Sequence, residues 1–409
     1  MIESVLPADF DRQRFLRDYW QKKPLLIRAG ELAFVDPITP EELAGLACEE
    51  DVESRLIQVD PAQETWQLRT GPFTEDQFES LPQTHYSLLV QAVDHWVDEV
   101  SALLADFDFI PAWRIDDVMV SYATDGGNAG PHFDYYDVFL IQGMGQKRWQ
   151  IGARCNSMTP RRDESGLRLL KDFVVEQEWI VNPGDILYLP PGVSHYGVAI
   201  GDSMTYSIGF RAPALADIVS GLADQILDEL TQDQRYVDAR PQLPLHPGEI
   251  SVEVIQHVRD RVLGLLDQPG SIRQWFGKTM TTPRYAHDEH GDCCDHDHDH
   301  DLDHDHSHDH DGPGITDIIT LRDALGGGAE VFKVPGSRYA YAVDDTHAEL
   351  FVDGECYHCN WRLLPLLQAL STPGYTEALD PEVVAACMAD EEAAQLLLTL
   401  YNRGCLIIG

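Results

Sequence analysis

One stretch decides the fold of this chain: Gly126-Gly127-Asn128-Ala129-Gly130-Pro131-His132-Phe133-Asp134-Tyr135-Tyr136-Asp137, which continues into Val138-Phe139-Leu140-Ile141. A glycine-rich turn here leads into a predicted strand that starts with His132-x-Asp134. Side chains two apart on a strand point to the same side, so His132 and Asp134 are placed to bind one metal ion. Such a pair also occurs as ordinary hydrogen-bonded polar residues, so a third ligand is needed.

The best candidate for the third ligand is His195, at the end of Pro190-Pro191-Gly192-Val193-Ser194-His195. This Pro/Gly turn follows an apolar predicted strand, residues 185–189. Two imidazoles and one carboxylate form the facial triad that leaves iron(II) open positions for a chelating cosubstrate and oxygen. Zinc in a hydrolase uses the same three ligands, so a feature specific to oxygen chemistry is required.

That feature lies in Gly145-Gln146-Lys147-Arg148-Trp149-Gln150-Ile151, which predicts a turn and a strand with Lys147, Trp149 and Ile151 on one face. A lysine that faces inward near a metal needs an anionic partner. The distal carboxylate of 2-oxoglutarate would supply one while its keto-acid end chelates iron. By itself Lys147 is typical of a surface lysine on a strand. In the order His-x-Asp, Lys-x-Trp, Pro-Gly-x-x-His, it indicates a 2-oxoglutarate site.

The order of these motifs resembles the JmjC branch of the 2-oxoglutarate oxygenases. More narrowly, it is similar to the bacterial ribosomal oxygenases that hydroxylate an arginine of the sixteenth large-subunit ribosomal protein. The resemblance spreads over residues 1–280 and is thin beyond them. Its matching segments are residues 20–25, 88–93, 113–119, 130–132, 136–139, 183–188 and 206–213. The resemblance implies Fe(II), 2-oxoglutarate and O2 as cofactor and cosubstrates.

The chain is too long for one ordinary core, and several domains are expected. The resemblance implies an α+β architecture: a double-stranded β-helix (cupin/JmjC barrel), a helical dimerisation module and a C-terminal winged-helix domain. We place these at residues 1–212, 213–282 and 315–409, with a disordered His/Asp-rich linker at 283–314. From the residues alone, the helical region is either a dimerisation module or a helical cap on a monomeric barrel.

A predicted strand at residues 115–122 places Asp117, Met119 and Ser121 on one face. If that face lines the pocket, Asp117 offers a carboxylate to a guanidinium and Met119 packs against its stem. Ser121 would assist Lys147 at the cosubstrate carboxylate. A local salt bridge at the strand end is the plainer interpretation of Asp117.

Tyr136 lies two positions beyond Asp134, where it would line the cleft beside the metal, although a core tyrosine is the alternative. Ser207 lies in the predicted closing strand, residues 205–210. The resemblance assigns four residues to the substrate arginine: Asp117, Met119, Tyr136 and Ser207. It implies hydroxylation of that arginine at its β-carbon.

Three other activities stay open at this point. Ribosomal oxygenases that act on histidine and JmjC enzymes that demethylate N-methyl-lysine belong to the wider group, and a non-enzymatic metal-binding cupin is the third alternative. Lys147 argues against simple metal storage, which needs no buried cation beside the metal. Some bacterial members carry arginine where Lys147 stands. Either cation pairs with a carboxylate, lysine less rigidly.

The net charge is −40, and residues 287–311 contribute 11 of those negative charges, which leaves −29 on the rest. This argues against nucleic acid, whose phosphates need Lys and Arg. It favours either a basic ribosomal-protein partner or solvation in a salty environment. The eight cysteines are scattered, unlike a disulfide framework. No signal peptide and no membrane span are evident, so we expect a cytoplasmic protein.

The tract at residues 287–311 interleaves nine histidines with acidic residues. It has too little apolar area to fold, so we expect a disordered linker with incidental or metal-buffering affinity. It is not part of the family pattern.

The C-terminal pattern indicates a winged helix. It predicts a helix at residues 321–325, strands at 330–334, 339–343 and 349–352, a hairpin turn at Asp353-Gly354, and helices at 360–371 and 380–403. Because the domain is acidic, protein contact is favoured over DNA. Cys356-x-x-Cys359 with His358 resembles half of a zinc site, and no second pair is evident.

Local patterns predict further elements. Thr39-Pro40-Glu41-Glu42 has capping-box chemistry for a helix. Apolar spacing predicts helices over residues 9–20, 86–105, 218–227 and 252–266, a strand over 24–28, and a hairpin of 55–59 with 65–69.

Overall fold

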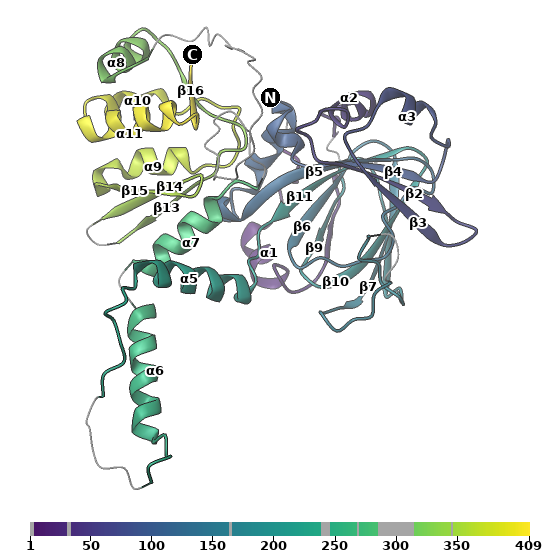
Figure 1. Ribbon diagram of the computed structural model, residues 1–409. Coiled ribbons are helices and arrows are strands. Elements are labelled where there is room, and N and C mark those ends of the chain that lie inside the picture. Colours follow the sequence, from purple (N-terminus) through teal and green to yellow (C-terminus); the bar gives the residue numbers. More distant parts are fainter. Residues whose placement is uncertain are drawn as a thin grey trace, which may run out of the picture.

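The computed structural model describes residues 4–30, 34–162, 166–238, 246–267, 270–284, 315–344 and 347–409. Figure 1 shows a β-sheet body, a second and smaller domain near the C-terminus, and helices α5 and α7 between them. Most of the expected linker, with its His/Asp-rich tract at 287–311, lies outside the described residues. Within the described chain, no helix is long and apolar enough to cross a membrane.

The N-terminal elements follow the local patterns closely. Thr39 caps its helix, since its side chain accepts from the backbone N–H of Glu42 (3.2 Å) and its own N–H donates to the Glu42 carboxylate (2.8 Å). The predicted hairpin and short strand are confirmed, and the first helix is shorter than expected. The elements are α1 (Arg12–Asp18), β1 (Leu25–Ile27), α2 (Pro40–Leu46), β2 (Ser54–Asp60), β3 (Thr65–Thr70) and α3 (Glu75–Glu79).

The predicted helix over residues 86–105 is wrong. The segment begins as strand β4 (Tyr86–Val90) and continues as η1 (Val93–His95), α4 (Asp98–Ser101) and η2 (Ala102–Phe107). β4 pairs with β2 on one edge and with β5 (Ile115–Ala123) on the other. Hydrogen bonding at both edges stabilises a strand there, although the apolar spacing is helical.

Two sheets pack against each other to form the body (Figure 1). The larger has the order β1-β9-β6-β11-β5-β4-β2-β3, and the smaller has the order β10-β7-β8. The named pairings in both are antiparallel. The remaining strands are β6 (Asp137–Gln142), β7 (Gln146–Arg154), β8 (Gln177–Val181), β9 (Ile186–Leu189), β10 (Val193–Ile200) and β11 (Ser203–Phe210).

Strand β6 is buried at every position because both of its faces are covered. Val138 and Leu140 pack between the two sheets with Trp149 of β7. Phe139 points the other way and packs against Phe15 of α1, with the ring centroids 5.3 Å apart. The large sheet therefore has two different faces. One face packs against the N-terminal helix and is called the outer core here, and the other, called the inner face, points toward the smaller sheet.

The same alternation puts polar side chains on the inner face. Val118 and Val120 of β5 belong to the outer core, so Asp117, Met119 and Ser121 point inward. On β11, Tyr206 and Ile208 belong to the outer core, so the side chain of Ser207 also points inward.

Helices α5 (Leu215–Glu229) and α6 (Val252–Leu266) follow the barrel, as predicted, and α7 (Ser271–Thr281) comes after them. Gly221 of α5 lies against the indole of Trp275, and Gly277 of α7 lies against Phe351 of the C-terminal domain. Helix α7 therefore packs against both α5 and the C-terminal domain. Helix α6 extends away from the body, and its described residues include no buried side chain (Figure 1).

The C-terminal domain has the predicted elements in the predicted order, but its last strand, Leu406–Ile408, which pairs with Val331–Lys333, was not predicted. The expected helix over residues 380–403 is two helices, because Asp390 caps the second by accepting from the Glu392 N–H. Asp353 and Gly354 form the hairpin turn with φ of 49° and 82°. The elements are α8 (Ile318–Gly326), β12 (Val331–Lys333), β13 (Tyr339–Val343), β14 (Ala348–Val352), β15 (Glu355–Cys359), η4 (Trp361–Leu363), α9 (Leu364–Leu370), α10 (Pro381–Met388), α11 (Glu391–Asn402) and β16 (Leu406–Ile408).

Candidate active site

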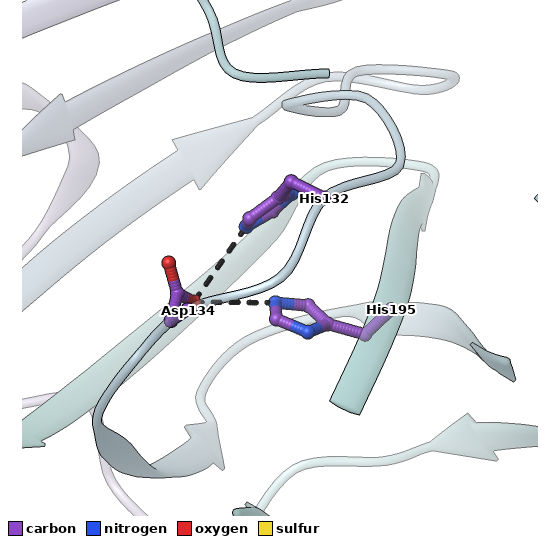
Figure 2. A group of neighbouring side chains, drawn as sticks. All are labelled: His132, Asp134 and His195. Atoms are coloured by element: carbon purple, nitrogen blue, oxygen red, sulfur yellow. Dashed lines mark ion pairs between the residues drawn. The ribbon is translucent and has the colours of Figure 1, made fainter. Parts of the chain in front are cut away.

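The three predicted metal ligands, His132, Asp134 and His195, lie together in the barrel (Figure 2). The Asp134 Oδ2 atom is 3.9 Å from Nε2 of His132 and 3.6 Å from Nε2 of His195. Their positions follow from backbone pairing. His132 and His195 exchange two backbone hydrogen bonds of 3.0 and 2.8 Å, and the N–H of Gly192 donates to the Asp134 carbonyl at 2.7 Å.

One local expectation is corrected. His132 and Asp134 were expected to begin a strand, but β6 begins only at Asp137, and His132 makes an isolated bridge to His195 of β10. Residues 132–136 come before the paired part of β6, and the side chains of His132 and Asp134 point toward His195 (Figure 2). The two-residue spacing still brings both ligands to one side.

The two imidazoles are oriented for metal binding. Nδ1 of His132 lies 2.8 Å from the Gly130 carbonyl, and Nδ1 of His195 lies 3.0 Å from the Val193 carbonyl. A carbonyl only accepts hydrogen bonds, so each Nδ1 carries the proton and each Nε2 keeps its lone pair. Burial lowers the pKa of His195 to about 4, which keeps this imidazole neutral at physiological pH.

Lys147 lies on the inward face of β7 with Trp149 and Ile151, as predicted, and only 7% of its surface is exposed. Its ammonium donates to the hydroxyl of Thr205 at 3.2 Å and lies 5.3 Å from the Trp149 ring centroid. Among the described residues, no carboxylate lies within ion-pair distance of this ammonium. Burial without such a partner lowers the pKa of Lys147 to about 8.

The Lys147 ammonium thus fits the distal carboxylate of a bound dicarboxylic acid. The ring of Trp149 lies 5.9 Å from that of His195, so the face carrying Lys147 adjoins the triad. A buried cation with only hydroxyl and aromatic neighbours gains most from an anion that arrives with a ligand. The triad and this cation together fit a divalent metal and 2-oxoglutarate.

Asp117 is buried on the same inner face, with 5% of its surface exposed. Its Oδ2 accepts from Gln91 Nε2 at 2.9 Å and from the backbone N–H of Ala92 at 3.0 Å. Ala92 has φ of 50°, in the left-handed region, and such strain is often found where a structure orients a functional group. Burial and the charge of Asp116 raise the pKa of Asp117 to about 6.

The other predicted substrate residues gather around Asp117. Met119 and Ser207 are direct partners in the pairing of β5 with β11. Tyr136 has 43% of its surface exposed, and the charges of Asp134 and Asp117 contribute to raising its pKa. Tyr136 is therefore near both carboxylates, and its ring is partly open to solvent.

Two residues of this site were missed in the sequence. Thr205 shares the inner face of β11 with Ser207, so strand alternation was a sufficient signal for it. Ser121, predicted to assist Lys147, is the cross-strand partner of Thr205, whose hydroxyl accepts from the Lys147 ammonium. The contact of Gln91 with Asp117 could not be predicted from local spacing, because the pairing of β4 with β5 brings the two residues together.

Comparison with known families gives two matches. A family described as the JmjC domain matches residues 102–218, and one described as the ROXA-like winged helix matches residues 264–406. The second match includes α7, in agreement with the packing of that helix on the C-terminal domain.

Two similar proteins have informative names. The ribosomal protein uL16 3-hydroxylase of Escherichia coli (strain K12) is 41% identical over 278 residues, which cover 67% of this chain and 72% of that protein. A probable ribosomal oxygenase of Haemophilus influenzae is 36% identical over 308 residues, covering 72% of this chain and 74% of that protein.

A similar solved structure is YcfD, a ribosomal oxygenase from Escherichia coli, in complex with cobalt and 2-oxoglutarate. It superposes with a TM-score of 0.81 at 33% identity and covers 98% of each chain. The likeness therefore extends over barrel, helices and C-terminal domain together.

Proposed function

This chain belongs to the JmjC-domain ribosomal oxygenases, and from that membership we propose that it is an iron(II)- and 2-oxoglutarate-dependent hydroxylase of an arginine in ribosomal protein uL16. The observation that carries the proposal is the buried ammonium of Lys147, which lies in the same barrel as the His132, Asp134 and His195 cluster. The similar E. coli protein, crystallised with cobalt and 2-oxoglutarate, supports both ligands.

The metal would be held by Nε2 of His132, Nε2 of His195 and a carboxylate oxygen of Asp134. Iron(II) with 2-oxoglutarate supplies the activation of oxygen, with succinate and carbon dioxide as the products of the cosubstrate. Lys147 and Thr205 would bind the distal carboxylate and so set the direction in which the keto acid enters. The Trp149 ring lies beside the Lys147 ammonium, with its centroid 5.3 Å away.

Asp117 would bind the guanidinium of the substrate arginine. Gln91 and Ala92 hold one carboxylate oxygen through two hydrogen bonds, which fixes the plane of the group. A bidentate pair with a guanidinium depends on that plane. Met119, Ser207 and Tyr136 would surround the side chain, so that an aliphatic carbon, the β-carbon in our proposal, faces the metal.

The test is an oxygen-dependent reaction of the purified chain with iron(II), 2-oxoglutarate and uL16, read by mass spectrometry. We expect a gain of about 16 Da on one arginine, with loss of the product in Asp134→Ala. A gain on histidine would reassign the target residue. Loss of a methyl group from methyl-lysine would reassign the reaction. If the chain binds metal but forms no succinate in the presence of any of these substrates, a non-enzymatic metal-binding protein would be favoured.

We also propose that a second copy of this chain covers α5 and α6. Helix α6 exposes a row of apolar side chains at helical spacing, and its described residues include no buried side chain. The row includes Val252 (80% exposed) and Ile255 (58%) and continues through Val258, Val262 and Leu263. Helix α5 adds Leu215, Val219 and Leu227. An apolar surface of this extent usually marks a protein interface.

A further inference from the structure

We propose that Glu349, Cys356 and His358 of the C-terminal domain form a zinc site, separate from the catalytic triad. Cys356 and His358 are two apart on β15, so their side chains lie on one face. Glu349 lies on β14 and is the direct cross-strand partner of His358. Three residues with metal-binding side chains therefore meet on one face of the β14–β15 hairpin.

The separations suit a tetrahedral ion. Oε1 of Glu349 lies 3.4 Å from Nδ1 of His358, and ligand atoms of all three residues lie within 4.8 Å of one another. Zinc binds imidazole nitrogen and carboxylate oxygen at about 2.0–2.2 Å, so tetrahedral angles place such atoms roughly 3.4 Å apart. The existing spacing of the carboxylate and the imidazole therefore needs little adjustment, and the more flexible thiol completes the set.

The ligand chemistry selects zinc. A thiolate, an imidazole and a carboxylate are the three protein ligands that zinc uses, with water or another group in the fourth position. Thiolate ligation disfavours magnesium and calcium, which prefer oxygen. Cys356 is half-buried and His358 is exposed, so the face is open to an ion from solvent.

Cys359, the other member of the Cys-x-x-Cys motif, lies outside this site. It is three residues from Cys356 on a strand and therefore points to the opposite face, where it is buried with its Sγ directed at the Tyr357 carbonyl. The sequence showed no second half for a zinc site, and Cys359 does not supply one. The additional ligand is Glu349, brought in by pairing across the hairpin.

The carboxylate of Glu349 is already oriented by α7. Nε of Arg273 lies 2.5 Å from Oε2, which leaves Oε1 facing His358, and Gln274 donates to Oε1 at 3.2 Å. Metal-binding carboxylates are commonly held in this way through their second oxygen. Because Arg273 and Gln274 belong to α7, zinc here would fasten the hairpin to the helix that also packs on α5.

Cobalt(II) titration tests the site, because only a cysteine ligand produces a thiolate-to-cobalt charge-transfer band. The protein would be the full chain carrying Cys293→Ser and Cys294→Ser, which removes sulfur from the His/Asp-rich tract. The catalytic triad contains no sulfur and is silent in this band. The triad and the His/Asp-rich tract also take up cobalt, so the total cobalt bound does not count this site. We expect the band to level off at the intensity of one thiolate–cobalt bond per chain and to disappear on zinc addition.

Variants then assign the ligands. Cys356→Ser should abolish the band, whereas the matched control Cys359→Ser should retain it. His358→Gln and Glu349→Gln should each weaken cobalt binding by about tenfold or more, with unchanged circular dichroism. His358 is exposed, so its replacement tests the site even if another variant misfolds. Absence of the band in the starting protein, its survival in Cys356→Ser, or unchanged affinity in His358→Gln would overturn the proposal.

Discussion

The guanidinium of Arg338, in the C-terminal domain, donates a hydrogen bond of 3.0 Å to the backbone carbonyl of Asp116 in β5. The same side chain donates to the carbonyls of Ile115 (2.5 Å) and Trp113 (3.3 Å). The next residue after Asp116 is Asp117, which we propose binds the substrate. The C-terminal domain thus holds the start of the strand that carries this carboxylate.

Replacing Arg338 with methionine should therefore raise KM for uL16 several-fold while KM for 2-oxoglutarate stays unchanged. Loss of a charged donor that satisfies buried carbonyls should also lower the free energy of unfolding by about 2–3 kcal/mol. Both values can be measured by steady-state kinetics and urea denaturation. Arg362→Met, on an exposed arginine of the same domain, is the control. Lower stability with an unchanged KM for uL16 would limit Arg338 to holding the domains together.

Lys147→Met should raise the Kd of 2-oxoglutarate by roughly ten- to a hundredfold, because the distal carboxylate loses its cation. Metal affinity should not change, since the triad is intact. Lys147→Arg should keep most of the affinity, because either cation pairs with a carboxylate. Isothermal titration calorimetry under anaerobic conditions measures the affinities for 2-oxoglutarate and for the metal. Equal affinity in Lys147→Met would show that the ammonium does not bind 2-oxoglutarate.

The affinity of the wild type for 2-oxoglutarate should also depend on pH. Burial lowers the pKa of Lys147 to about 8, so the free protein loses the cation as pH rises through that value. The Kd should increase about tenfold for each pH unit well above it. Lys147→Arg should have a flat profile over the same range, because a guanidinium keeps its proton. A flat profile in the wild type would contradict this assignment.

Asp117→Asn should impair uL16 hydroxylation and leave binding of 2-oxoglutarate intact. The amide keeps the shape of the carboxylate but loses its charge toward the guanidinium, an effect of about 2–3 kcal/mol or roughly a hundredfold in kcat/KM. Ser207→Ala is a milder comparison on the same face. The assay is hydroxylated uL16 formed per succinate produced. Unchanged hydroxylation in Asp117→Asn, or a matching loss of 2-oxoglutarate binding, would contradict the role of Asp117 in binding the arginine.

Much of the site follows from local periodicity in the sequence. Lys147 and Trp149 lie two apart on β7, and Asp117 and Met119 lie two apart on β5, so strand alternation alone placed each pair on one face. The three metal ligands were also predicted, because each lies in a short motif with its own turn signal.

The parts that were missed depend on pairing between distant segments. The strand β4 was mistaken for a helix because its partners β2 and β5 lie elsewhere in the chain. Glu349 reaches Cys356 only across a hairpin, and Arg338 reaches Asp116 only through domain packing. Spacing along one segment carries no information about such contacts.

Asp94 makes stability depend on pH. It is fully buried beside Asp117, and burial raises its pKa to about 8, well above the unfolded value near 3.8. A raised carboxyl pKa stabilises the fold fully below about pH 4, and this contribution is lost as pH rises through about 8. Asp94→Asn keeps an acceptor for the Val118 N–H without the charge. It should therefore raise the free energy of unfolding by about 1–3 kcal/mol more at pH 8 than at pH 4. A urea-denaturation series that showed the same difference at both pH values would contradict the raised pKa.

The final prediction concerns α6. If a second copy covers its apolar row, Ile255→Glu with Val262→Glu should convert a dimer into a monomer, because two buried charges without partners oppose association by several kcal/mol. Light scattering coupled to size exclusion measures the mass directly. Arg261→Glu, a charge reversal at an exposed position on the opposite side of the helix from that row, is the control and should remain dimeric. The described residues of α6 include no buried side chain. The double variant should therefore keep the circular dichroism spectrum and the hydroxylase activity of the wild type. A wild-type protein that is monomeric at micromolar concentration would instead leave α6 as a surface for a different partner, and the second-copy proposal would be wrong.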